Sequence, residues 1–122
     1  MKVLVVEDNE ERMGFFRELF LEDQMTFTTT SREAIALLME VTYEIIFLDI
    51  DLDDGLGRGL EVARSLKGSP NDYSPLIVHS MNVSAASKVE RISPGSLLMP
   101  IIEMRQIFAQ FGKDELLERF FE

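Results

Sequence analysis

The chain has 122 residues and no cysteine, and 46% of its residues are hydrophobic. This length predicts one domain, residues 1–122, and the missing cysteines exclude a disulfide scaffold and a cysteine zinc site. A net charge of −10 argues against binding to duplex DNA or to an anionic membrane. No apolar run is long enough to span a bilayer and no signal-peptide pattern is visible, so we expect a cytoplasmic protein.

Strand and helix patterns alternate through the first half of the chain. An apolar run over residues 3–6 predicts a buried strand, and apolar side chains recur at helical spacing in residues 10–22. Residues 25–29 alternate, as in a strand with one exposed face, and a capping-box pattern begins a helix over residues 30–39. The four apolar residues within 44–49 predict a strand that is covered on both faces.

The same alternation continues after a loop rich in Asp and Gly at residues 50–59. The remaining predicted elements are a helix over 60–67, a strand over 76–80, a helix over 84–92, a strand over 96–99, a helix over 101–111 and a last amphipathic turn over 114–121, with Asp114 as its cap. Five strands alternating with five helices predict an α/β fold, a doubly wound five-stranded parallel sheet with helices on both faces.

Polar side chains follow three of the predicted strands at their carboxyl ends. They are Glu7, Asp8, Asp49, Asp51, Asp53, Asp54, His79, Ser80 and Asn82. Ligands of doubly wound sheets bind at this edge, near the point where the strand order reverses. Clustered carboxylates repel one another unless a cation is present, and oxygen ligands favour Mg²⁺, Mn²⁺ or Ca²⁺. The alternative is that the first two acids only cap a helix and the later ones are solvated.

The chain resembles the receiver domains of response regulators over essentially its whole length. The matching segments are VLVVEDN at the start, FLD at the end of the third strand, GLEVARSL in the next helix and the small hydroxyl residue Ser80. The resemblance implies a flavodoxin-like, receiver-type fold and a Mg²⁺ or Mn²⁺ site at Glu7, Asp8 and Asp49. It also implies phosphorelay signalling, in which Asp49 accepts a phosphoryl group from a histidine kinase.

Two departures point to a smaller group within the receivers. Receivers carry a Lys where this chain has Met99, and the loop IDLDDGLGRG is longer than theirs. In LD-x-DL, GLEVA and VHSMN, and in lacking that Lys, the chain is similar to the cyclic-phosphate processing receiver domains, although a His that often lies between their two aspartates is Ile50 here.

This second resemblance implies a metal-dependent phosphohydrolase that acts on cyclic phosphates of nucleotides or RNA ends. Asp49, Asp51 and His79 would be catalytic, and Asp51 would join the metal ligands. Ser80, Asn82 and Arg12 would contact the phosphate. Opening a cyclic phosphate needs an activated water, charge neutralisation and a proton for the leaving oxygen, and an imidazole suits the proton transfer. Alternatively, His79 is a strand-end histidine bonded to backbone, and Arg12 pairs with a nearby acid.

Other interpretations remain open. A degenerate receiver would act as an interaction module or homodimer through Leu116, Leu117, Phe120 and Phe121, although we prefer that these residues pack in the core. The Asp49-x-Asp51-x-Asp53 spacing is similar to a calcium loop, but its Gly and Glu each fall one position late. FLDIDLD also resembles the nucleophile motif of haloacid-dehalogenase phosphatases, which place it on their first strand instead.

Overall fold

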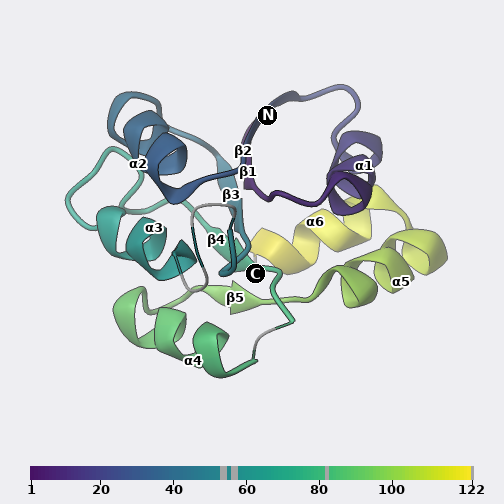
Figure 1. Cartoon of the computed structure of the whole chain (residues 1–122). Coiled ribbons are helices and arrows are strands. Elements are labelled where there is room, and N and C mark those ends of the chain that lie inside the picture. The colour runs from purple at the N-terminus through teal and green to yellow at the C-terminus, as the bar shows by residue number, and fades with distance from the viewer. Residues whose placement is uncertain (53–54, 56–57, 82, 122) are drawn as a thin grey trace.

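In the computed structural model, which describes residues 1–52, 55, 58–81 and 83–121, a five-stranded sheet lies between two layers of helices (Figure 1). The strands are β1 (Lys2–Val6), β2 (Gln24–Thr28), β3 (Ile45–Leu48), β4 (Leu76–Val78) and β5 (Leu97–Leu98). The helices are α1 (Glu10–Leu19), α2 (Ser31–Glu40), α3 (Gly59–Ser65), α4 (Val83–Ile92), α5 (Ile101–Phe111) and α6 (Lys113–Phe121).

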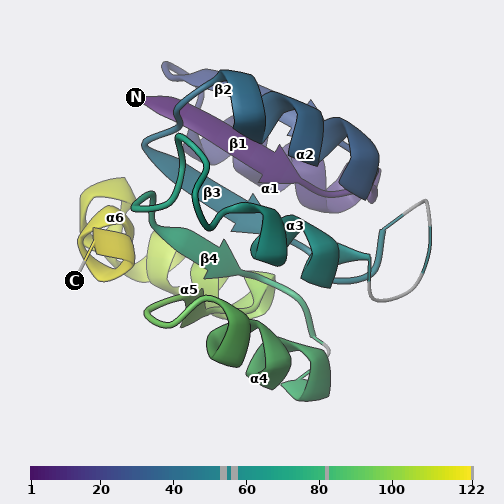
Figure 2. The same cartoon turned by 90° about the vertical axis from the view of Figure 1, so that its left-hand side faces the viewer.

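The sheet confirms the predicted doubly wound topology. Its strand order is β2-β1-β3-β4-β5, and every neighbouring pair is parallel. The strand arrows in Figure 2 accordingly point the same way, so their carboxyl ends meet at one edge. The chain winds from β1 outward to β2 and then crosses to β3 on the other side. The edge beyond β1 and β3 is therefore the switch point, where such folds bind their ligands.

Alternate residues of each strand face opposite helical layers. Val3 and Val5 of β1 pack in a core with α1, α5 and α6, whereas Leu4 and Val6 pack in a second core with α2, α3 and α4. Figure 1 shows these two sets of helices on opposite sides of the sheet. Each fully buried aliphatic or aromatic side chain contributes about 1.5–3 kcal/mol by leaving water. Among the described residues, none of the helices has the length and apolar character needed to cross a bilayer.

The predicted cap of α2 is present, and α1 also begins at a side-chain cap. The Asn9 side chain accepts a hydrogen bond from the backbone N–H of Arg12 at 3.0 Å, which begins α1. Thr30 accepts the same kind of bond from Glu33 at 3.2 Å, which begins α2. Such caps satisfy backbone donors that a helix leaves unpaired in its first turn. The cap of α1 also sets where the residues just after β1 lie.

Two predicted elements differ most from the structure, and most of the others begin or end one or two residues from the predicted position. Helix α1 ends at Leu19 instead of residue 22. Phe20 is buried at the helical spacing that the sequence shows, but it is the cap residue after the last turn and does not continue the helix. The predicted last turn is a nine-residue helix, α6, so the described residues form six helices and Asp114 lies within the first turn instead of capping it. Tertiary packing accounts for this helix: Phe120 is buried, and its ring lies 5.1 Å from that of Phe47.

The C-terminal apolar residues divide between core and surface. Leu116 and Phe120 are buried, and Leu117 packs against the same core, as we preferred. Phe121 is 49% exposed. Lys113 also binds Asp23 at 2.8 Å, and Asp23 lies 3.1 Å from the N-terminal ammonium. These contacts hold α6 against the turn between α1 and β2.

Gly59 allows α3 to start in contact with the end of β3. Its backbone N–H donates to the Ile50 carbonyl at 2.8 Å. A Cβ atom on Gly59 would lie 2.5 Å from the Asp49 carbonyl oxygen and 2.6 Å from the Ile50 Cα. Both are backbone atoms, so a side chain at Gly59 would move the segment that carries Asp49.

Two glycine substitutions test this close approach. Gly59→Ala should lower the free energy of unfolding by about 1–3 kcal/mol, because the added methyl group overpacks against backbone. Gly14 lies within α1 with open space around it, so Gly14→Ala should raise stability by about 0.5–1 kcal/mol. Urea unfolding followed by circular dichroism measures both, and a stable Gly59→Ala variant would contradict the contact.

Candidate functional site

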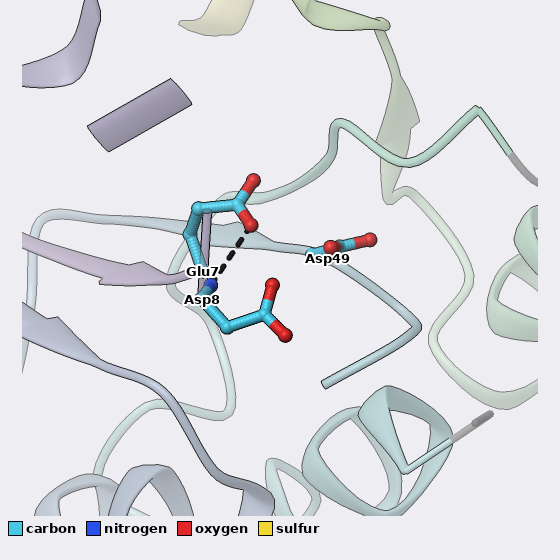
Figure 3. Close-up of side chains that lie close together, drawn as sticks. All are labelled: Glu7, Asp8 and Asp49. Carbon is cyan, nitrogen blue, oxygen red and sulfur yellow. Dashed lines mark hydrogen bonds between the residues drawn. The ribbon is translucent and has the colours of Figure 1, made fainter. Parts of the chain in front are cut away.

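Three carboxylates meet at the switch point of the sheet. Glu7 and Asp8 directly follow β1, and Asp49 directly follows β3 (Figure 3). One oxygen atom from each of the three lies within 4.8 Å of the others. Glu7 and Asp49 are buried, whereas Asp8 is half-buried. We call these three residues the acidic cluster.

Glu7 is fully buried, and its carboxylate is surrounded by donors. Arg12 binds it through both Nε, at 2.5 Å, and Nη2, at 3.0 Å. The backbone N–H groups of Asp8 and Asn9 donate to it at 2.8 and 3.1 Å, and His79 Nε2 lies 2.9 Å away. Burial alone would raise the pKa of Glu7, but the hydrogen bonds from His79 and Arg12 outweigh it and hold that pKa well below its usual range. Glu7 is therefore ionised, and His79 donates to it through Nε2.

The pKa of Asp49 is shifted in the opposite direction. Burial and then the neighbouring charge of Glu7 raise it, while His79 and Arg12 act against this rise. Arg12 Nη2 lies 3.4 Å from Asp49 Oδ2, and the backbone N–H of Asp51 reaches Asp49 Oδ1 at 3.4 Å. Arg12 Nη2 also lies 3.9 Å from Asp8 Oδ1. One guanidinium group thus contacts all three members of the acidic cluster.

A cavity of about 610 Å³ opens above these groups. Its lining residues are Asp8, Asn9, Glu11, Arg12, Asp49, Asp51, His79, Ser80, Met81, Ile101, Ile102 and Arg105. Most of the residues that we predicted for the site are among them. Glu7 is fully buried and does not line the cavity. Asn82, Asp53 and Asp54 lie outside the described residues.

His79 is 2% exposed and belongs to the wall of this cavity. Its backbone N–H donates to the Leu48 carbonyl, and its ring meets that of Phe16 edge to face at 5.2 Å. Its Nδ1 is buried and has no hydrogen-bond partner among the described residues. Among the described residues, the ring of His79 therefore bonds to the side chain of Glu7 and not to backbone.

The cations of the cavity come from helices. Arg12 pairs with the nearby acids, as one of our two interpretations expected. Arg58 does not line the cavity, and it pairs with Glu61 at a distance of 2.6 Å. Arg105 in α5 also lines the cavity, and the sequence analysis did not predict this. Its position in the first turns of the helix after β5 was the available signal, because helices of this fold begin at the carboxyl edge of the sheet. Met99, at the receiver lysine position, is buried in the core with α1, α5 and α6. Among the described lining residues there is no lysine.

The Glu7 network predicts a loss of stability when its charge is removed. Glu7→Gln should lower the free energy of unfolding at pH 7 by about 1–3 kcal/mol, because hydrogen bonds to a charged group become weaker neutral ones. Because the pKa of Glu7 is lower in the folded than in the unfolded protein, its charge stabilises the fold at any pH above the unfolded pKa. This stabilisation is lost as the pH falls toward the folded pKa. The difference from wild type should therefore shrink when the pH falls below about 4.

Urea unfolding at pH 7, 5 and 3 measures this difference. The matched control is Glu10→Gln, because Glu10 lies on the surface of α1 and, among the described residues, its ion pair is with the exposed Arg17. It should change stability by less than about 0.5 kcal/mol at each pH. Equal effects of the two substitutions at pH 7 would contradict a structural role for the Glu7 charge.

Solved receiver domains share this fold. The receiver domain from Rhodospirillum rubrum aligns with a TM-score of 0.75 at 12% identity, over 100% of this chain and 95% of that one. The receiver domain of Francisella response regulator 1452 gives 0.68 at 25% identity, over 98% and 92%. The receiver domain of the Pseudomonas aeruginosa sensor kinase PA1611, solved with magnesium in its active-site cleft, gives 0.66 at 18%, over 97% and 92%. The chain therefore has the fold of these receiver domains.

The family within the receivers is also shown. Residues 2–93 match the family model described as the cyclic-phosphate processing receiver domain. The chain belongs to this family, as the LD-x-DL and VHSMN motifs indicated. The match ends after α4, so β5, α5 and α6 lie beyond it. No curated protein sequence matches the chain.

Proposed function

We propose that the domain is a metal-dependent phosphohydrolase that opens cyclic phosphates on nucleotides or RNA ends. The observation that carries this proposal is a single cavity, at the switch point, whose wall combines carboxylates, a guanidinium, an imidazole and a hydroxyl group. Membership of the cyclic-phosphate processing family supports it. The buried Met99 supports it as well, since a thioether cannot pair with an aspartyl phosphate as the receiver lysine does.

The acidic cluster fits a hard divalent cation. Its donors are all carboxylate oxygens, and the charge of Glu7 disfavours ionisation of Asp49. Asp8 and Asp49, with Glu7 and Asp51 beside them, would hold Mg²⁺ or Mn²⁺. A cation bound there would neutralise phosphate charge and lower the pKa of a bound water. The magnesium in the cleft of the PA1611 receiver domain is consistent with this assignment.

The remaining lining residues would orient the phosphate. Among the described residues, the contacts of Arg12 use Nε and Nη2, so Nη1 is the nitrogen left for a phosphate oxygen. Ser80 lies in the cavity wall beside His79 and would donate its hydroxyl to a second oxygen. We assign Asn82 the same role. These contacts would hold the ring of the cyclic phosphate against the carboxylates.

Hydrolysis requires two proton movements. A water oxygen forms a new bond to phosphorus, and a carboxylate of Asp49 or Asp51 accepts the proton that the water releases. The bond between phosphorus and one ester oxygen breaks, and that oxygen takes a proton to become a hydroxyl group. We assign this proton to His79, which would give it from Nδ1 of a doubly protonated ring, because the Nε2–H donates to Glu7. The product is a phosphate monoester with the second ester bond intact.

Turnover of 2′,3′-cyclic mononucleotides with Mg²⁺ or Mn²⁺ tests the proposal. Asp49→Asn should lower kcat/KM by at least about 100-fold and should abolish the metal dependence, and His79→Ala should lower kcat/KM by a similar factor. The surface variant Glu10→Gln is the matched control and should retain wild-type turnover. Hydrolysis that persists in EDTA, or in Asp49→Asn, would contradict the proposal.

Phosphorelay signalling is the second candidate. The observation in its favour is the position of Asp49, which ends β3 of a receiver fold next to an acid pair. In this case Asp49 would gain one phosphoryl group from acetyl phosphate or a histidine kinase, and His79 would not be needed. Intact-mass spectrometry distinguishes the two candidates, because a lasting mass increase that survives His79→Ala and is lost in Asp49→Asn supports signalling.

A further inference from the structure

We infer that Arg12 is a built-in counter-ion of the acidic cluster, and that a divalent cation has to displace its guanidinium group in order to bind. This inference rests on the proposed function, because it concerns the cation of that same site. It assigns Arg12 a role in setting cation affinity, in addition to the phosphate contact.

The contacts of Arg12 coincide with the members of the cluster. Its guanidinium binds both oxygens of Glu7, lies 3.4 Å from Asp49 and lies 3.9 Å from Asp8. Among the described residues, every ion pair of the Arg12 guanidinium is with a carboxylate of the cluster. The side chain is nevertheless 40% exposed and lines the cavity, so it has a path out of the cluster.

The backbone of Arg12 is held in place while its side chain can move. The Arg12 N–H donates to the Asn9 cap at 3.0 Å, in the first turn of α1. Several rotatable bonds separate this anchored backbone from the guanidinium group. Release from the carboxylates would therefore swing the guanidinium toward the cavity without unfolding the helix.

A guanidinium and a divalent cation compete for the same oxygens. Mg²⁺ needs oxygen ligands at about 2.0–2.1 Å in nearly ideal octahedral geometry. Both Glu7 oxygens and Asp49 Oδ2 already face Arg12, and a second positive group in the cluster would repel the first. A cation that binds therefore gains contacts with the carboxylates, but the Arg12 contacts are lost. The cation affinity is for this reason lower than it would be for the same cluster without Arg12. The released guanidinium then faces the space that a phosphate would occupy.

Calorimetric titration of the whole chain with Mn²⁺ and Mg²⁺ tests this competition. Arg12→Gln should bind the cation at least about tenfold more tightly than wild type, because the cluster loses its internal competitor. The matched control is Arg105→Gln, which removes the same charge from the same cavity but contacts Glu11, at 3.8 Å, outside the cluster. It should change Kd by less than about threefold, since an exposed charge is screened.

Two further measurements test the displacement even if the Arg12→Gln variant fails to fold. Arg12→Lys keeps the charge but lacks the two-pronged contact with Glu7, so its affinity should lie between those of wild type and Arg12→Gln. In wild type, Mg²⁺ should shift the NMR signal of the Arg12 Nε–H group, because its bond to Glu7 breaks. An Nε–H signal that stays unchanged while the protein is saturated with Mg²⁺ would overturn displacement.

The outcomes separate this inference from the proposed function. If Arg12→Gln and wild type bind the cation equally, the counter-ion role is overturned while the metal site stands. If only Arg12→Gln binds a cation, the counter-ion role is supported and metal-dependent catalysis by the wild type is overturned. If no variant binds a cation, both are overturned.

Discussion

The ionised Glu7 carboxylate is the buried charge on which this edge of the molecule depends. A carboxylate without exposure to water is costly unless every lone pair meets a donor. Here the donors come from α1 through Arg12, from the end of β4 through His79 and from the chain just after β1. The charge therefore ties three elements together at the switch point, and its low pKa reflects how completely it is bonded.

The same charge sets a conflict at Asp49. Glu7 is stabilised by its donors, whereas the pKa of Asp49 is raised by burial and then by the neighbouring charge of Glu7. Groups whose pKa is shifted by burial and by a neighbouring charge cluster at functional sites, and these two acids lie at the ligand-binding edge of the fold. Arg12 reduces this conflict by contacting both acids, and a bound cation would reduce it further. The atoms that stabilise this edge are thus the ones that we propose to hold the cation.

The cations that line the cavity lie on α1 and α5. Met99 occupies the position of the usual lysine, and its side chain packs in the core beside α5. Positive charge reaches the cavity from Arg12 on α1 and Arg105 on α5 instead. Residues at this edge can differ without disturbing the sheet, because they lie in loops and first turns beyond the strands.

The sequence by itself determined the parallel sheet, since apolar runs such as Val3–Val6 and helix caps such as Thr30 are local signals with a local physical cause. It also placed most of the site residues at one edge, because strand ends in such a sheet converge. Only the tertiary structure decided that α6 is a helix, because Phe120 needs the core ring of Phe47. It also decided that the Arg12 guanidinium, which pairs with Glu7 and Asp8 of its own segment, contacts Asp49 as well, because Asp49 lies 37 residues away on another strand end and no local pattern records that contact.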